Sequence, residues 1–529
     1  MPPNTEANLD TSLPTPTTHD ELKPNIITSQ VFTSRVEQGE ALFIFENKVY
    51  KVDGFFARHP GGELALRHGI GHDVTDEIRS MHPPKVYNYM MKKFYIGEYV
   101  SIKEETSPSS SDVPKIQPEQ FLENKIQASW GGRISVEAFD EAILEINYAH
   151  KHELEQDKQN AALRVDNKTM RLKYQALEQE LKQRGLFECN YYRYYKECCR
   201  YVLLFYLALW FALRGTCFSH YLFSAICMAG FWHQMVFTAH DAGHNGITGK
   251  VEIDHVIGVT IANFIGGLSL GWWKHSHNVH HIVTNDPEHD PDIQHIPFMA
   301  VTTRLFENLY SSYYGRYMKM DRVAKFFISR QHHLYYLILA CGRFNLHVLS
   351  FQYLLDSTKK KRTPTLEWCG ILFFFVWYGS LLAYLPNWPI RLMYFVVSYM
   401  LTFPLHVQIT LSHYGMSTDV IENEPFPAKM LRTTMDVCCP DWLDWFHGGL
   451  QFQAVHHLFP RLPRHNLRLC VPHVRQFCRE TGLHYYMYHF STGNGVVLGN
   501  FKAVADQVHL LNDVAIYNAD QFATHKKLH

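Results

Sequence analysis

Four long apolar stretches in the second half of the chain constrain its fold more than any other feature. They cover residues 201–213, 217–237, 367–386 and 389–412. Crossing a hydrocarbon core about 30 Å thick takes about 20 apolar residues in a helix, so these stretches predict membrane spans. The first stretch has only 13 residues and reaches this length only if its helix extends beyond it at both ends. Buried helices of a soluble protein are the alternative.

The order and flanking charges of these stretches predict two hairpins that return to the cytosol. The third and fourth stretches are separated by little more than Pro386, Asn387 and Trp388. A basic run at residues 359–362 places the start of the third stretch on the cytosolic side, where Lys and Arg are in excess. Residues 253–273 are apolar but rich in glycine, and we expect them to lie at the membrane interface.

Composition limits the possible partners of the chain. Among 529 residues, 50 Lys and Arg balance 51 Asp and Glu, which argues against nucleic acid as a partner. The 11 cysteines form no CxxC pair, so neither a disulfide framework nor a thiolate zinc site is indicated. Histidine is abundant, with 33 residues, which makes metal binding the first function to consider.

Changes in composition along the chain predict six segments. They are a disordered tail (1–29), a small soluble domain (30–100), a linker rich in Ser and Pro (101–120), cytosolic helices (121–195), the membrane domain (196–510) and a C-terminal tail (511–529).

The small soluble domain carries a pair of histidines in two separate loops. His59 lies in an HPGG motif, and His82 follows 23 residues later. A planar cofactor held from both faces needs one imidazole on each side, and the glycines let the backbone approach the ring. The domain resembles cytochrome b5, which implies an α+β haem domain with both histidines as axial ligands of haem b. The alternative is two unrelated histidines. His68 and His72 are interpreted as ordinary solvated residues.

Three further histidine clusters follow apolar segments. The members of these clusters are His240 and His244; His277, His280 and His281; and Gln453, His456 and His457. Spacings of three and four residues put such side chains on one helix face. Seven histidines and a glutamine are too many ligands for one metal ion, so we expect two ions to share them. The predicted topology places all three clusters on the cytosolic face.

Four residues near these clusters are secondary candidates. His413, at the end of the fourth stretch, is a candidate additional ligand. His406 lies two helical turns deeper, a depth that suits the wall of a tunnel. Asp290 and Asp292 are candidates to orient the imidazoles of the second cluster, with a solvated loop as the alternative.

The haem domain narrows the choice of metal. Imidazole binds zinc, copper or iron, but zinc cannot use delivered electrons. Two iron ions that receive electrons from a tethered one-electron carrier can reduce O2 to a species able to remove hydrogen from a methylene group. The linker would raise the concentration of the donor around the acceptor.

At these residues the chain resembles the front-end membrane desaturases. The third cluster begins with Gln453, as in that branch, although Ala454 and Val455 depart from its usual pattern. The segments GLFECNYYRYYKECCRY and WLDWFHGGLQFQAVHHLFPRLPRHNLR are most similar to fungal Δ8 sphingolipid desaturases. The resemblance implies a haem domain fused to an all-α integral membrane domain, with four transmembrane helices in two hairpins, interfacial helices and a cytosolic histidine-rich cap.

The resemblance also implies an activity and its partners. The expected reaction is O2-dependent insertion of a C8–C9 double bond into the long-chain base of a ceramide or related lipid in the bilayer. Cytochrome b5 reductase would supply the electrons. The ending Lys526-Lys527-Leu528-His529 is similar to a dilysine retrieval signal, which favours the endoplasmic reticulum membrane with both termini cytosolic. The rivals are a Δ6 or Δ5 acyl desaturase, a sphingolipid hydroxylase, a membrane-anchored haem electron carrier and a zinc hydrolase.

Overall fold

The computed structural model describes residues 25–101, 164–359 and 361–527. The predictions for residues 1–24, for the linker after residue 101 and for the cytosolic helices up to residue 163 lie outside these ranges. β1 begins at Ile26, so the ordered domain starts inside the predicted disordered tail. Similarly, the boundary predicted near residue 510 falls within α21, which spans Phe490–Lys527.

A small four-stranded sheet forms the N-terminal domain. Its strands are β1 (Ile26–Thr28), β2 (Leu42–Phe45), β3 (Lys48–Lys51) and β4 (Tyr95–Val100), in the order β1-β4-β3-β2. β1 and β4 are parallel, whereas the other pairs are antiparallel. Leu42 and Ile44 point into one apolar cluster, and Phe43 and Phe45 point into another, because neighbouring side chains alternate across a strand.

Short helices lie between the strands of this sheet, one between β1 and β2 and the others between β3 and β4, and the latter carry the two histidine loops. They are α1 (Ser29–Glu37), η1 (Phe56–Arg58), α2 (Glu63–Arg67), α3 (Thr75–Met81), η2 (Val86–Met90) and η3 (Met91–Phe94). His59 follows the end of η1, and His82 follows the end of α3. The domain is therefore α+β, as expected. α6 (Asn167–Gln183) begins after Asp166, whose carboxylate accepts from the amides of Lys168 and Thr169.

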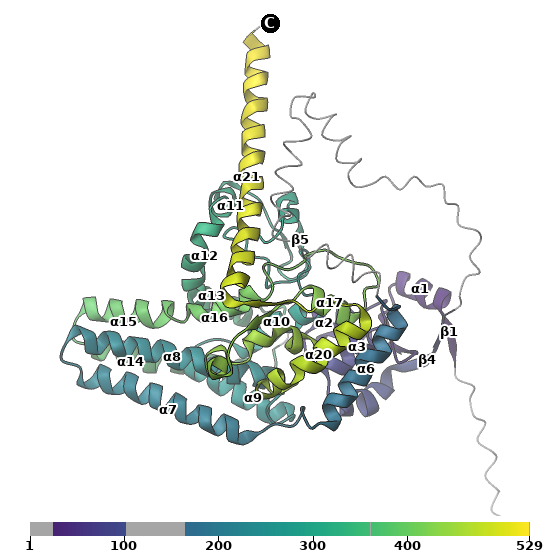
Figure 1. Cartoon of the computed structure of the whole chain (residues 1–529), viewed down its shortest axis with the longest axis horizontal. Coiled ribbons are helices and arrows are strands. Elements are labelled where there is room, and N and C mark those ends of the chain that lie inside the picture. Colours follow the sequence, from purple (N-terminus) through teal and green to yellow (C-terminus); the bar gives the residue numbers. More distant parts are fainter. Residues whose placement is uncertain (1–24, 102–163, 360, 528–529) are drawn as a thin grey trace, which may run out of the picture.

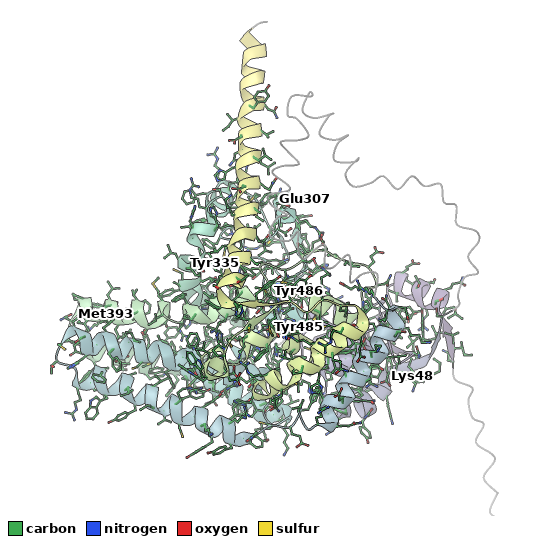
Figure 2. The ribbon with its side chains drawn as sticks, viewed as in Figure 1. Lys48, Glu307, Tyr335, Met393, Tyr485 and Tyr486 are labelled. Atoms are coloured by element: carbon green, nitrogen blue, oxygen red, sulfur yellow. The ribbon has the colours of Figure 1, made fainter. Side chains whose placement is uncertain are left out.

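Long helices build the membrane half of the molecule. They are α7 (Tyr191–Arg214), α8 (Phe218–Gly243), α14 (Pro364–Tyr384), α15 (Trp388–Met400) and α16 (Phe403–Leu411). α7 and α15 pack against α8, and together with α14 they form an elongated layer (Figure 1). Met393, in α15, and Lys48, in the N-terminal sheet, lie at opposite ends of the molecule (Figure 2).

Helix length and composition allow three to five membrane crossings among the described residues. Among the described residues, three segments are long and apolar enough to cross a bilayer, namely Phe218–Gly243, Pro364–Tyr384 and Trp388–Leu411. Two bent helix pairs would raise this number to five. The stretch at residues 201–213 lies in α7, between Arg200 and Arg214. The four predicted spans therefore remain a prediction.

The glycine-rich segment at residues 253–273 contains a sharp break rather than one continuous helix. α9 (Val251–Val259) and η4 (Thr260–Ile265) precede the break, and α10 (Leu270–Val283) follows it at an angle of 117°. Gly267 has a φ of +71°, and a Cβ there would lie 2.3 Å from the ring of Phe374. A glycine is therefore required for the chain to turn beside α14.

The segment after α10 contains helices that the apolar pattern did not reveal. They are η5 (Thr303–Glu307), α11 (Arg322–Ile328), α12 (Gln331–Ala340) and α13 (Gly342–Leu355), with a short hairpin of β5 (Tyr310–Ser311) and β6 (Arg316–Tyr317). α12 and α13 are inclined at 66° to each other.

The C-terminal part covers the third histidine cluster. Its elements are α17 (Phe426–Arg432), β7 (Asp436–Cys438), η6 (Asp441–Leu443), α18 (Asp444–His447), η7 (Leu450–Phe452), α19 (Gln453–Leu458), η8 (Arg464–Asn466), α20 (Leu467–Thr481) and β8 (Met487–His489). β8 pairs in parallel with β7, and α21 then projects away from the body of the molecule (Figure 1). An apolar cluster joins α6, α17, α19 and α20.

Candidate metal and haem centres

The histidine pair of the N-terminal domain has the geometry of two axial ligands. The ring centroids of His59 and His82 lie 6.0 Å apart, on loops from different parts of the domain. Nδ1 of His59 is 2.9 Å from the Gly62 carbonyl, and Nδ1 of His82 is 3.2 Å from the Ile78 carbonyl, so Nε2 of each ring is left for a metal. Burial lowers the pKa of His82 to about 4, which keeps its imidazole neutral.

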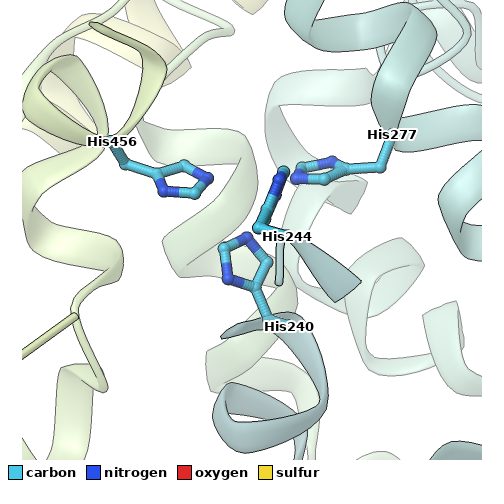
Figure 3. Close-up of side chains that lie close together, drawn as sticks. All are labelled: His240, His244, His277 and His456. Carbon is cyan, nitrogen blue, oxygen red and sulfur yellow. The ribbon is translucent and has the colours of Figure 1, made fainter. Parts of the chain in front are cut away.

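Four histidines from three helices form a first group. His240 lies in the last turn of α8, His244 follows that helix, His277 lies on α10 and His456 on α19. Their candidate ligand nitrogens lie within 4.8 Å of one another. Figure 3 shows these four imidazoles pointing toward a common centre.

A second group contains His280, His413 and His457, which are all buried. Their candidate ligand nitrogens also lie within 4.8 Å of one another. Nδ1 of His413 is 3.2 Å from the carbonyl of Thr433, so its Nε2 remains for the group. The structure thus places His413 beside the second and third clusters, where the sequence made it a candidate ligand.

The two remaining predicted ligands lie beside these groups. His281 lies between them, with ring centroids 4.8 Å from His244 and 4.3 Å from His457. Its Nε2 is 3.1 Å from Nε2 of His277. Gln453 begins α19 and is buried, and it lines the cavity described below.

The two groups fit a pair of metal ions by the chemistry of their donors. Nε2 of His244, His456 and His457 is buried, and none of these atoms has a hydrogen-bond partner within the described ranges. Burial, followed by the neighbouring rings, lowers the pKa of His456 and His457 well below the ordinary value. Neutral imidazoles with free lone pairs are the form that binds iron, zinc or copper, whereas an unpaired buried nitrogen is costly without a ligand.

A carboxylate orients one of these imidazoles, and a second carboxylate lies near another. The carboxylate oxygens of Asp290 lie 2.9 and 3.1 Å from Nδ1 of His280, and both side chains are buried. Asp292 lies 3.8 Å from Nδ1 of His277. Asp290 also accepts from the amides of Asn285 and Asp292, so its own position is fixed. Asp290 therefore occupies the orienting position that the sequence suggested.

A cavity of about 690 Å³ reaches the histidine groups. Apolar side chains of α8, α12 and α13, including Trp232, Ile338 and Leu349, line much of it. His240, His277, His280 and His413 also face it. His406 lies in its wall, as predicted from its depth. An apolar cavity of this size that ends at polar groups is suited to a chain-like, hydrophobic ligand.

Comparison with known proteins identifies the family. Residues 28–100 match the cytochrome b5-like heme/steroid binding domain, and residues 216–489 match the fatty acid desaturase family. The chain is 40% identical to the Delta 8-(E)-sphingolipid desaturase of Emericella nidulans, over 93% of this chain and 96% of that protein. It is 42% identical to the enzyme of the same name from Komagataella phaffii, over 90% and 93% of the two chains. It is also 30% identical to the acyl-lipid (9-3)-desaturase of Borago officinalis, over 91% and 94%.

The chain belongs to the fatty acid desaturase family. The resemblance inferred from the motifs is thereby confirmed, and the protein is an oxidoreductase with a fused cytochrome b5 domain.

Three polar residues that hold the clusters of this desaturase were not found from its sequence. Arg464 and Tyr194 both bond to Asp241, which is next to His240 in the first cluster. Glu367 accepts from the amide of Gly271 at 3.1 Å, at the start of α10. The bonded residues are 47, 96 and 223 residues apart in the chain, so no local spacing indicates these contacts.

Asp436 has a similar role at the third cluster. Its carboxylate accepts from the amide of Ala454 at 2.7 Å, in the first turn of α19, and from the hydroxyl of Tyr485. Figure 2 labels Tyr485 in the centre of the molecule. Burial raises the pKa of Asp436 to about 7. Asp436 thereby bonds to the first turn of the helix that carries His456 and His457 and fixes the start of that helix.

His68 is not the solvated residue that the sequence suggested. Its ring centroid lies 4.8 Å from that of His289 in the desaturase domain, and burial lowers its pKa to about 4. Only the packing of the two domains covers part of this side chain.

Replacing Asp290 with asparagine is expected to weaken metal binding without unfolding the desaturase. The amide keeps the size of the carboxylate but removes the charge that holds the Nδ1 proton of His280. Such outer partners usually contribute about 10- to 100-fold to metal affinity or activity. Metal content and product formation of the purified variant check this expectation, with Asp419→Asn on the surface as a control. An unchanged iron content and rate would contradict it.

Proposed function

We propose that this desaturase introduces a C8–C9 double bond into the long-chain base of a ceramide. Two iron ions, held by the two histidine groups with His281 and Gln453 beside them, would supply the O2 chemistry. A haem b between His59 and His82 would carry electrons from cytochrome b5 reductase. The high identity to two fungal Delta 8-(E)-sphingolipid desaturases over nearly their whole length supports this choice of substrate.

The observation that carries the proposal is the convergence of seven histidines, four of which line an apolar cavity of about 690 Å³. When bound there, the metal pair supplies an oxidant derived from O2 that takes hydrogen from an unactivated methylene group. The chain's own residues do the rest. The cavity holds an alkyl chain and excludes water, Asp290 holds the Nδ1 proton of His280, and Asp436 fixes the helix of His456 and His457.

The overall reaction balances with the electrons that the haem domain delivers. Two hydrogens leave adjacent methylenes of the lipid as two electrons and two protons. Two further electrons from reduced pyridine nucleotide and two protons from solvent complete the reduction of one O2 to two waters. The lipid gains one double bond.

The proposal also covers the membrane topology and the location of the protein. Four transmembrane helices in two hairpins would place all histidine clusters and both termini on the cytosolic side of the endoplasmic reticulum membrane. The 117° break between η4 and α10 supports this topology, because it lets residues 251–283 return to the side from which they came.

Lipid profiling tests the substrate. The chain is expressed in a host that lacks Δ8-unsaturated long-chain bases, and its sphingolipids and acyl lipids are compared with those of the host carrying an empty vector. We expect one new double bond in the long-chain bases and unchanged acyl chains. A new double bond in acyl chains would favour a Δ6 or Δ5 acyl desaturase instead, and a new hydroxyl group would favour a hydroxylase.

Metal analysis separates the enzyme from a haem electron carrier. The purified protein should contain two irons per chain beyond the haem iron. A protein with haem and no other metal would contradict the proposal.

A further inference from the structure

The first haem loop contacts the helix of the second histidine cluster. Nδ2 of Asn278 donates to the carbonyl of Gly61 at 3.2 Å. Gly61 is two residues from His59, and Asn278 directly follows His277. A single hydrogen bond therefore joins one haem ligand loop to the residue that follows a histidine of the first metal group.

The second haem loop makes a matching contact with the third cluster. The hydroxyl of Ser80 donates to the carbonyl of Leu458 at 3.0 Å, and this contact is buried. Ser80 is two residues from His82, and Leu458 directly follows His457. Nη1 of Arg461 also donates to the carbonyl of His82 itself, at 3.0 Å. Each haem ligand is thus linked to a different metal group.

Other contacts hold the same face of the haem domain against the desaturase domain. Leu64 and Ala65 of α2 pack against Val279 and Val283 of α10. The guanidinium of Arg171, on α6, bonds to Asp73 in the haem domain. These contacts make the position of the haem domain specific, because an apolar centre is combined with directional polar contacts at its edge.

α6 reinforces the contact at the third cluster. The hydroxyl of Tyr174 donates to the carbonyl of Leu458 at 2.6 Å, the same oxygen that Ser80 contacts. Gln175 donates to Asp76 on α3 at 3.2 Å. α6 therefore holds the helix that precedes His82 and the helix that carries His457 in one arrangement.

We propose that Asn278, Ser80 and Arg461 are positioning residues for electron transfer between the haem domain and the metal pair. They hold both haem ligand loops against the helices of the histidine clusters. They also complete two short paths of covalent and hydrogen bonds, along which electrons pass from the haem ligands to the histidine groups. A haem held between His59 and His82 would give up one electron in each transfer, its iron going from ferrous to ferric, and two such transfers would supply one turnover. The inference rests on the electron-carrier role assigned above to the haem domain.

Two conservative substitutions test this inference in the full-length protein. Asn278→Asp keeps the side-chain shape but points an acceptor at the Gly61 carbonyl, and Ser80→Ala removes one hydroxyl. In the combined variant, the equilibrium constant for docking of the haem domain is expected to fall about tenfold or more. Two hydrogen bonds are lost, and one of the two contacts becomes repulsive. Arg461→Met, which keeps much of the packing, tests the third contact in a separate protein.

Two readouts are measured on each variant in lipid nanodiscs. Hydrogen–deuterium exchange of the peptides that cover residues 59–64 and 80–84 reports docking independently of turnover. The reoxidation rate of the pre-reduced haem, in the presence of O2 and a ceramide, reports electron transfer. We expect about tenfold faster exchange and about tenfold slower reoxidation in the combined variant, with unchanged haem absorbance and iron content.

Ser34→Ala and Arg184→Met are the matched controls. Ser34, on the exposed face of α1, contacts Gln38 just after that helix, and Arg184, just after α6, pairs with Glu180. Both controls should behave like the wild type. Wild-type exchange and reoxidation in the combined variant and in Arg461→Met would overturn the inference. If the wild-type haem were not reoxidised faster with lipid than without it, the proposed function would fail, whereas the exchange data would still test the docking contacts.

Discussion

Replacing His280 with alanine is expected to abolish desaturation while the haem spectrum stays unchanged. The change removes one of three nitrogens in the second group and leaves the buried carboxylate of Asp290 without its imidazole partner. We expect activity to fall more than about 100-fold, since even a residue that only orients a metal ligand contributes about 10- to 100-fold. Product formation in the expression host and iron content of the purified protein measure the effect.

His333→Ala provides the control for this experiment. His333 lies on the exposed side of α12 and belongs to neither metal group. This variant should keep its iron and its activity. A His280→Ala protein that retains both irons beyond the haem and makes wild-type amounts of product would contradict the assignment of the second group.

Replacing His82 with alanine is expected to remove the haem and leave the non-haem iron in place. The haem domain loses one of the two rings that face each other across 6.0 Å, so haem binding and its absorbance should be lost. The histidine groups lie in the other domain and should keep their iron. Desaturation driven by reduced pyridine nucleotide should fall to background, because no carrier links the reductase to the metal pair.

His72→Ala is the matched control for the haem ligand. His72 is an exposed histidine of the same domain, and only its backbone carbonyl takes part in the sheet, as acceptor for the amide of Ile44. The control should bind haem and support desaturation. Loss of non-haem iron in His82→Ala, or turnover without haem, would contradict the division of roles between the two domains.

The sequence predicted the parts of the site that depend on local spacing. His277, His280 and His281 are three and four residues apart, so their helix was predictable and the structure contains it as α10. The loop positions of His59 and His82 were predictable from the HPGG motif and from their separation. Both predictions rest on the helical period and on turn chemistry, which act over a few residues.

The segments that the sequence did not reveal depend on packing. α12 and α13 are interrupted at Cys341 and line the cavity, yet they carry no apolar run as long as that of α14. The break between η4 and α10 depends on Gly267 lying against Phe374. His68 was placed in solvent because its neighbour, His289, is more than 200 residues away.

The sequence by itself determined which side chains are candidates to bind metal and haem, because residue type and helical spacing are local properties. It also determined the family, since its motifs are continuous in the chain. Only the tertiary structure decided how the histidines divide between two groups, which carboxylates and amides hold them, and where the haem loops lie against them. These features depend on contacts between helices far apart in the chain, and such contacts form only when the apolar faces of those helices pack together.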